Sequence, residues 1–173
     1  MLVQKIPALA KGEDQFNVII EIPANTPSVK YEVDKESGAL FVDRFMSTSM
    51  CYPCHYGFIP NTLALDGDPF DVLVCADYPL KPGSVISCKI IGMLEMTDEA
   101  GVDHKAVAVP SSSVSKEYDS IEELEHLSPL LLKQIKHFFE HYKDLDENKW
   151  VKLDKYVGKD EALKHVRNSL ITK

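Results

Sequence analysis

A short turn, DGDPFDVLV, crowds Asp66, Asp68 and Asp71 together before an apolar stretch. Asp, Gly and Pro are the ordinary residues of surface turns, so D-G-D-P alone is typical of a loop. Asp71, however, lies one residue inside the apolar stretch, which reads as a buried strand that would hold its carboxylate in place. Rigidly placed carboxylates without soft ligands favour hard divalent cations, and Mg²⁺ in particular. The turn therefore indicates a metal site.

A second acidic turn, TDEAGVDHK, places Asp98 and Asp103 around a glycine and follows them with Lys105. By itself this segment is typical of a hairpin loop. Together, the two turns place five aspartates at strand ends, where they can converge on more than one metal ion. A calcium loop of the EF-hand type is excluded for the first turn, because its sixth and twelfth positions are Asp71 and Asp77 instead of Gly and Glu.

Basic side chains lie where strands can direct them toward the same site. In VKYEV, Lys30 and Glu32 share one strand face by the period-two rule, although a half-solvated strand explains this pattern equally well. Arg44 follows two apolar residues on one face of ALFVDRF, which predicts an inward-facing arginine that must meet an anion. Tyr142 and Lys143 add a phenol and an ammonium group.

The elements that must position these residues change type along the chain. Strands are expected where β-branched and aromatic residues gather between Gly and Pro breaks, at 16–22, 29–33, 39–45, 70–75, 84–96 and 104–110. Strands this short and closely spaced suggest a small barrel or a strongly twisted sheet.

Helices are expected in the last third. A capping-box pattern begins at Ser120, and Ser128 with Pro129 begins a helix whose apolar face includes Ile135 and Phe138. A final helix is expected at 160–171, after an irregular stretch or short strand around Trp150.

Composition limits the possible functions. The chain has 173 residues, of which 45% are hydrophobic and 27% charged, so we expect a single domain over residues 1–173. Its net charge of -8 disfavours general attraction to nucleic acid or to an anionic membrane. No apolar run reaches the roughly 20 residues of a membrane span, and no signal core is recognised, so we expect a cytoplasmic protein without nucleic-acid or membrane partners.

Two further motifs have other interpretations. CYPCH, residues 51–55, matches covalent c-type haem, but that attachment accompanies export. A structural zinc would need a second close cysteine pair, whereas Cys75 and Cys88 are far apart, so the cysteines are interpreted as packing thiols. HFFEH, residues 137–141, matches a zinc-peptidase pattern but lacks a third ligand on an ordinary amphipathic helix.

The motifs DGDPFDVLV, EIPAN, KYEVDKESGALFVDRF, YPCHYGFIPNTL and HFFEHYKDL together resemble the soluble inorganic pyrophosphatases of family I, short bacterial type. The resemblance covers most of the chain, most densely from Phe16 to Val157. His55 departs from the family, which more often carries Asn there. The resemblance implies an α+β fold, in which a small five-stranded OB-like β-barrel is flanked by C-terminal α-helices.

The resemblance also implies roles for the acidic residues. Asp66, Asp71 and Asp103 would be the principal Mg²⁺ ligands, with several ions in each active site. Asp98 and Glu32 would help to hold the ions that arrive with substrate. The implied reaction is Mg²⁺-dependent hydrolysis of inorganic pyrophosphate to two orthophosphates, by in-line attack of a metal-activated water. The physics agrees, because bare carboxylates would repel a polyanion unless cations lay between them.

The remaining implied roles concern the substrate. Asp68 would be the general base or would orient the water, and it forms the catalytic set together with Lys30, Arg44 and Tyr56. Phosphate oxygens would contact Lys30, Arg44, Tyr56, Lys105, Tyr142 and Lys143, with Glu21 supporting the site. Bacterial members of the family form hexamers, which implies a homohexamer with His137, His141 and Asp144 at an interface.

Two rival functions remain at this point. Another metal-dependent phosphohydrolase, acting on nucleotides, would use the same kinds of residue. An OB-type module for single-stranded nucleic acid would need a basic groove with stacking aromatics, which the acidic composition disfavours.

Overall fold

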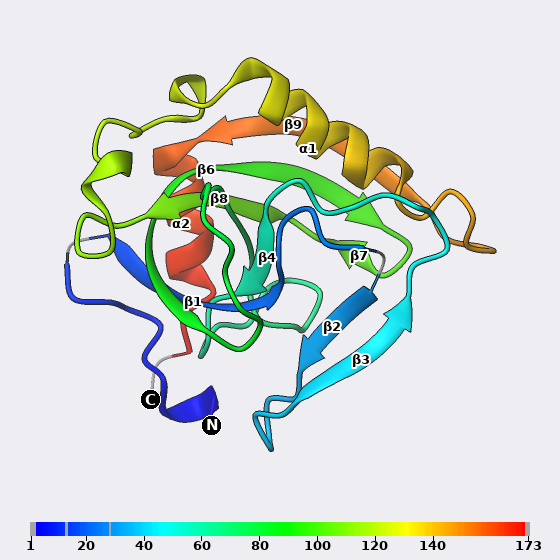
Figure 1. Ribbon diagram of the computed structural model, residues 1–173, viewed down its shortest axis with the longest axis horizontal. Coiled ribbons are helices and arrows are strands. Elements are labelled where there is room, and N and C mark those ends of the chain that lie inside the picture. The colour runs from blue at the N-terminus through cyan, green and yellow to red at the C-terminus, as the bar shows by residue number, and fades with distance from the viewer. Residues whose placement is uncertain (1–2, 13, 28, 172–173) are drawn as a thin grey trace.

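The computed structural model describes residues 3–12, 14–27 and 29–171. In this part of the chain, five strands close into a ring in the order β1, β4, β5, β8 and β6, with β6 pairing again with β1 (Figure 1). Their bounds are β1 Gln15–Ile22, β4 His55–Phe58, β5 Asp71–Val74, β6 Val85–Asp98 and β8 Lys105–Pro110. The predicted α+β fold with a five-stranded barrel is confirmed.

β6 closes the ring because it is long enough to pair on both sides. It is antiparallel to β1 near its start and to β8 along its length, and register shifts at Ile90/Gly92 and Leu94/Met96 let it bend. β4 approaches β1 closely at Gly57, where an added Cβ would lie 2.0 Å from the carbonyl oxygen of Ile19. Only glycine allows this approach.

Two further strands extend the sheet beside β6. They are β7 (Gly101–Val102) and β9 (Val151–Gly158), both antiparallel to β6. The segment around Trp150 thus leads into a full strand, where the sequence indicated an irregular stretch or a short strand. β4 was not expected at all, because its sequence HYGF is short and buried at every position, so it shows no alternation of polar and apolar residues.

β2 (Val29–Val33) and β3 (Leu40–Phe45) form a separate hairpin, which projects from the barrel in Figure 1. The prediction of an inward-facing side of β3 was wrong for its apolar residues, since Leu40 and Val42 are 40% and 54% exposed. Among the described residues, β2 and β3 pair only with each other, and β2 packs on the barrel through Tyr31 and Val33, so no layer of the described structure covers β3. Arg44 nevertheless lies opposite Lys30 and is half-buried.

The helix α1 (Pro129–His141) lies across the outside of the barrel next to β9 (Figure 1). It buries Ile135, Phe138 and Phe139 against alternate residues of the central strands, as the predicted apolar face requires. Pro129 occupies the first turn as expected, but the Ser128 side chain makes no capping hydrogen bond.

The helix α2 (Lys159–Asn168) packs against β6 and ends earlier than residue 171. It buries Ala162, Leu163 and Val166 against strand residues that alternate with those packed under α1. Both faces of the central sheet are therefore covered.

Short 3-10 turns complete the description: η1 Val3–Lys5, η2 Lys116–Tyr118 and η3 Leu124–His126. The capping box predicted at Ser120 was wrong. Instead, the His126 ring accepts backbone hydrogen bonds from Glu122 and Glu123 at the start of η3.

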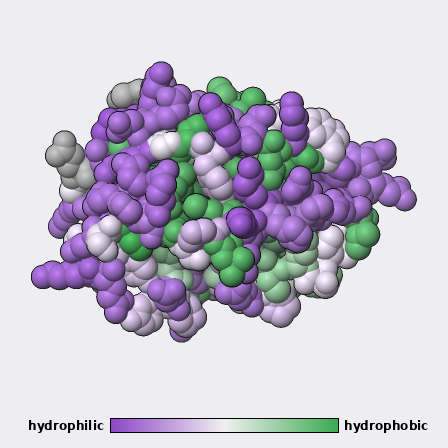
Figure 2. Space-filling model, turned by 90° about the horizontal axis from the view of Figure 1, so that it is seen from above, coloured by the Kyte–Doolittle hydropathy of each residue, from purple (hydrophilic) through white to green (hydrophobic). Residues whose placement is uncertain are grey.

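Figure 2 views the molecule from above Figure 1, the side on which α1 lies, and shows a mostly hydrophilic face with hydrophobic atoms gathered near its middle. Leu130 of α1 is 64% exposed.

Within the described residues, the helices are too short or too polar to cross a bilayer.

His55 is buried at the start of β4 and is held by backbone groups on both ring nitrogens. Its Nδ1 accepts from the Ala24 N–H at 3.0 Å, and its Nε2 lies 3.0 Å from the Tyr78 carbonyl oxygen. Because an N–H only donates and a carbonyl only accepts, the proton resides on Nε2 of a neutral ring. Burial lowers the pKa of His55 below its ordinary value.

This lowered pKa predicts a loss of stability in acid. Below about pH 6.5 the unfolded chain protonates His55 while the folded protein resists, so stability falls as pH decreases. We expect wild type to lose more unfolding free energy than His55→Asn between about pH 7.5 and about pH 5. Urea titrations at several pH values measure this difference. If the unfolding free energies of the two proteins changed equally with pH, the result would contradict a lowered pKa of His55.

Candidate active site

One cleft of about 340 Å³ collects every residue that the sequence assigned to the site. Its walls come from the start of β5, the end of β6, the start of β8, the β2–β3 hairpin and the residues after α1. The assigned residues that line it are Glu21, Lys30, Glu32, Arg44, Tyr56, Asp66, Asp68, Asp71, Asp98, Asp103, Lys105, Tyr142 and Lys143.

The first acidic turn is shaped by its own hydrogen bonds. The Asp66 carboxylate accepts from the Asp68 N–H at 3.0 Å, and Gly67 adopts a φ of 93° that L side chains rarely take. The carbonyl of Asp68 accepts from the Ala64 N–H at 2.7 Å, which closes the loop. The chain then enters β5 at Asp71. Local turn chemistry therefore sets all three carboxylates at one rim of the cleft.

Lys105 joins the two acidic turns. β5 and β8 run parallel, so Asp71 lies beside the start of β8, and the Lys105 ammonium is 2.5 Å from both Asp71 Oδ2 and Asp103 Oδ1. The lysine side chain is only 4% exposed. Burial opposes its charge, but Asp71 and Asp103 outweigh burial and raise the pKa of Lys105. The ammonium thus stays charged between two carboxylates.

The charge of Glu21, near the end of β1, is compensated by fewer positive groups. Its carboxyl accepts from the Val33 N–H at 2.7 Å, and the Lys35 ammonium is 3.8 Å away. Burial raises the pKa of Glu21 to about 7 in spite of these partners. Burial also raises the pKa of Asp66 and of Asp103 above their ordinary values. The cleft therefore holds more negative charge than its own cations relieve.

A second ion-pair network lines the same cleft. The Lys143 ammonium is 2.7 Å from Asp98 Oδ2 and 3.2 Å from Glu99 Oε1, and Lys149 lies 3.0 Å from the same Glu99 oxygen. The side chains of Lys143 and Asp98 are 8% and 10% exposed. On the hairpin, Lys30 pairs with Asp43 at 3.1 Å.

Three tyrosines line the cleft together with these charged side chains. Tyr56 is 8% exposed, and its hydroxyl is 3.5 Å from the Lys105 ammonium. The Tyr52 ring contacts Tyr56 at a centroid distance of 5.1 Å and Tyr142 at 6.5 Å. Burial raises the pKa of Tyr56 and of Tyr142, so both keep their phenolic protons and can donate to an anion.

The donor set fits a hard divalent cation. The acidic residues supply oxygen ligands alone. Burial, and to a smaller extent the nearby Asp71 carboxylate, raises the pKa of Asp66 and of Asp103, and a bound cation would offset both effects. Among the described residues, no three acidic, His or Cys side chains are already gathered around a common point. Between Asp71 and Asp103 the Lys105 ammonium takes the central position instead.

Comparison with known proteins decides the family. A sequence model described as inorganic pyrophosphatase matches residues 18–172. The chain belongs to the inorganic pyrophosphatase family. It is 60% identical over 154 residues to the inorganic pyrophosphatase of Yersinia pestis, covering 89% of this chain and 88% of that protein. It is 59% identical over 162 residues to that of Escherichia coli K12, covering 94% and 92%.

Solved inorganic pyrophosphatases share the fold. The structure from Coxiella burnetii superposes with a TM-score of 0.92 at 52% identity, covering 96% of this chain and 98% of that one. The structure from Thermus thermophilus gives a TM-score of 0.91 at 37% identity, covering 98% and 97%. The predicted family and the predicted enzyme class, an inorganic diphosphatase, are thereby confirmed.

Sequence reasoning missed several residues of the cleft. Lys35, Tyr52, Glu99 and Lys149 also line it. Glu99 directly follows Asp98 in the second acidic turn and Tyr52 lies within CYPCH, so both stood in motifs already singled out. Lys149 carried no signal, because only the fold brings the loop after α1 to Glu99.

The setting of Lys105 predicts a large loss of stability on its removal. Lys105→Met leaves Asp71 and Asp103 adjacent without their shared cation, which we expect to lower the free energy of unfolding by about 3 kcal/mol. Urea titration in EDTA measures this, with Lys81→Met as the control because Lys81 is exposed. Equal stability of the two variants would show that the buried lysine is not needed to hold these carboxylates together.

Proposed function

We propose that the protein hydrolyses inorganic pyrophosphate to two orthophosphates with Mg²⁺ as its cofactor and with in-line attack of water. The observation that carries this proposal is the convergence of both acidic turns and four basic residues, Lys30, Arg44, Lys105 and Lys143, on one cleft. Membership of the inorganic pyrophosphatase family supports the choice of substrate.

Metal ions would be held by the acidic rim. We propose Asp66, Asp71 and Asp103 as principal ligands, with Asp98 and Glu32 as further ligands. When bound, several Mg²⁺ ions would supply the positive charge that lets carboxylates and a polyanionic substrate share one cleft, and would acidify water.

The protein's own groups would orient the reactants. Asp68, on the exposed side of the turn, is proposed to accept the proton of the attacking water or to orient it. Lys30, Arg44, Lys105 and Lys143 would neutralise charge that grows on the departing phosphate. Protonated Tyr56 and Tyr142 would donate to phosphate oxygens, and Glu21 would support the hairpin through Val33.

We further propose that residues 1–173 act as a single domain in a cytoplasmic homohexamer, without nucleic-acid or membrane partners. His137, His141 and Asp144 are proposed at an interface between copies, since the His137 and His141 rings lie 4.7 Å apart and His141 meets Asp144 at 2.8 Å on the exposed side of α1.

Substrate choice is tested by phosphate release. With Mg²⁺ present, we expect rapid release of phosphate from pyrophosphate. Rates from ATP and from simple phosphomonoesters should be at least about 100-fold lower. The reason is that the cleft of about 340 Å³ is lined mainly by charged side chains, which suit phosphate groups better than an organic substituent such as a nucleoside. Comparable rates on ATP would favour the nucleotide phosphohydrolase instead.

A further inference from the structure

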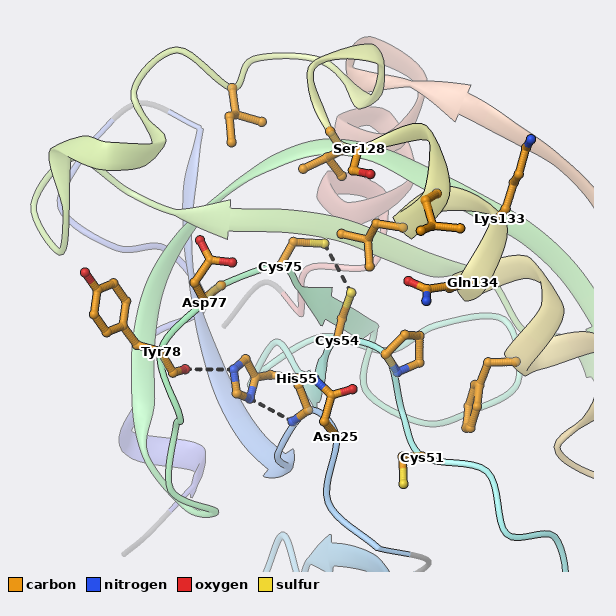
Figure 3. Close-up of a pocket in the computed structure, with 18 of the residues that line it drawn as sticks. Asn25, Cys51, Cys54, His55, Cys75, Asp77, Tyr78, Ser128, Lys133 and Gln134 are labelled. Atoms are coloured by element: carbon orange, nitrogen blue, oxygen red, sulfur yellow. Dashed lines mark hydrogen bonds between the residues drawn. The ribbon is translucent and has the colours of Figure 1, made fainter.

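Two buried thiols lie in contact outside the charged cleft. All four cysteines are free, and the sulfur atoms of Cys54 and Cys75 are 3.3 Å apart (Figure 3). Cys54 is 2% exposed and Cys75 is 6% exposed. Figure 3 shows the Cys51 thiol turned away from this pair. The contact is thus specific to two of the four side chains.

The backbone around the pair suits a disulfide. β4 and β5 are antiparallel with His55 opposite Val74, so Cys54 and Cys75 continue the same register one step beyond the strands. Directly opposite residues of such a ladder have Cα atoms about 4.5–5.5 Å apart, within the range that a disulfide spans. Side-chain rotation, with a small movement of the strand ends, would bring the sulfur atoms to about 2.05 Å.

A groove gives small oxidants access to the pair. It measures about 1090 Å³, and Cys54 and Cys75 both line it, together with His55, Asp77 and Tyr118. The hydrogen bond with Cys54 and burial both raise the pKa of Cys75, so only a small fraction of this thiol is thiolate at neutral pH. The pair therefore stays reduced until an oxidant is present.

We propose that Cys54 and Cys75 are a redox modification site that closes reversibly into a disulfide in the presence of a hydroperoxide. One thiol loses its proton, and the thiolate attacks an oxygen of hydrogen peroxide and breaks the O–O bond. This yields a sulfenic acid and a hydroxide, which takes up the released proton to become water. The second thiol then attacks that sulfur, forms the S–S bond and releases the sulfenic oxygen as a second water. Two thiols are oxidised, and one hydrogen peroxide is reduced to two waters.

The bond would tie together the two strands that feed the active-site cleft. Cys54 precedes Tyr56 by two residues, and Cys75 directly follows β5, the strand that begins at Asp71. Closing the gap between the sulfur atoms from 3.3 Å would combine side-chain rotation with a small movement of these strand ends. Because a shift of about 1 Å at catalytic groups can cost about 100-fold in rate, we expect at least a tenfold lower kcat/KM in the cross-linked protein.

Peptide mapping after treatment with hydrogen peroxide tests the proposal. We expect the reduced wild-type protein to lose two of its four thiols and dithiothreitol to restore them. Trypsin leaves all four cysteines in one peptide, since Lys81 precedes Pro82 and no other Lys or Arg lies between Arg44 and Lys89. A protease that cleaves before Asp separates Cys75, in DVLVCA, from the peptide that carries Cys51 and Cys54.

Variants identify the partner of Cys75. Cys51→Ser should still form the cross-link, whereas Cys75→Ser and Cys54→Ser should each keep all their remaining thiols. If a variant fails to fold, the wild-type map still shows whether Cys75 is joined to the peptide that carries Cys51 and Cys54, and fragmentation of that peptide between the two cysteines identifies the partner. No cross-linked peptide, or a cross-link that Cys51→Ser abolishes, would overturn the proposed site.

The hydrolysis rate decides whether the bond acts on the cleft. The hydrolysis rate is the one measurement here that rests on the proposed function. A reduced protein without pyrophosphatase activity would refute that function, but the peptide map of the cross-linked thiols would remain valid. Reversible loss of activity in wild type and Cys51→Ser, with Cys75→Ser resistant, is the expected pattern. Unchanged turnover in fully cross-linked protein would overturn the proposed effect on the cleft.

Discussion

Asp71→Asn is expected to lower kcat/KM for pyrophosphate by on the order of 100-fold or more. The substitution keeps the side-chain size but removes the negative charge of Asp71, which lines the cleft and meets the Lys105 ammonium at 2.5 Å. It therefore leaves Lys105 with one carboxylate instead of two and removes a proposed metal ligand. Phosphate release at saturating Mg²⁺ measures the effect.

Asp154→Asn is the matched control. Asp154 is exposed on β9 and stands apart from the residues that line the cleft, so the same chemical change should leave the rate nearly intact. Circular dichroism and urea titration separate lost chemistry from lost folding. Equal activity of wild type and a folded Asp71→Asn variant would refute the assignment of Asp71 to the site.

Removal of divalent cations should abolish activity. After EDTA treatment and desalting, we expect the rate to fall by on the order of 1000-fold and to recover when Mg²⁺ is added, because the excess carboxylates of the cleft then face a polyanion without intervening positive charge. Full activity in the stripped protein would rule out the proposed cofactor.

Stability provides a readout of the same ion without catalysis. A cation that binds only the folded protein stabilises it by about 2.7 kcal/mol at a hundredfold excess over its Kd. Added Mg²⁺ should therefore raise the urea midpoint of stripped wild type and of Asp154→Asn, and raise that of Asp71→Asn much less. An equal shift in all three proteins would place the bound ions elsewhere.

Much of the candidate site could be predicted from the sequence because its chemistry is concentrated in short motifs. The D-G-D-P turn forms through hydrogen bonds within residues 64–68, and such local hydrogen bonds follow from residue type. Helix faces also follow from local periodicity, which is why Ile135 and Phe138 were placed correctly.

Predictions failed where a segment's environment comes from distant parts of the chain. β4 is short and buried at every position, so its sequence carries no period. Leu40 and Val42 show strand alternation, yet the hairpin that holds them lacks a covering layer and leaves them exposed. Burial is decided by what packs against a strand, and alternation alone does not reveal it.

By itself, the sequence determined the family, the residue types of the cleft and the local shape of its acidic turn. Only the tertiary structure decided that Lys105 lies between Asp71 and Asp103, and that Cys54 meets Cys75 while Cys51 does not. The physical reason is strand register. Closure of the barrel sets β5 beside β8 and β4 beside β5 over long sequence separations, and no local propensity encodes which side chains those pairings bring together.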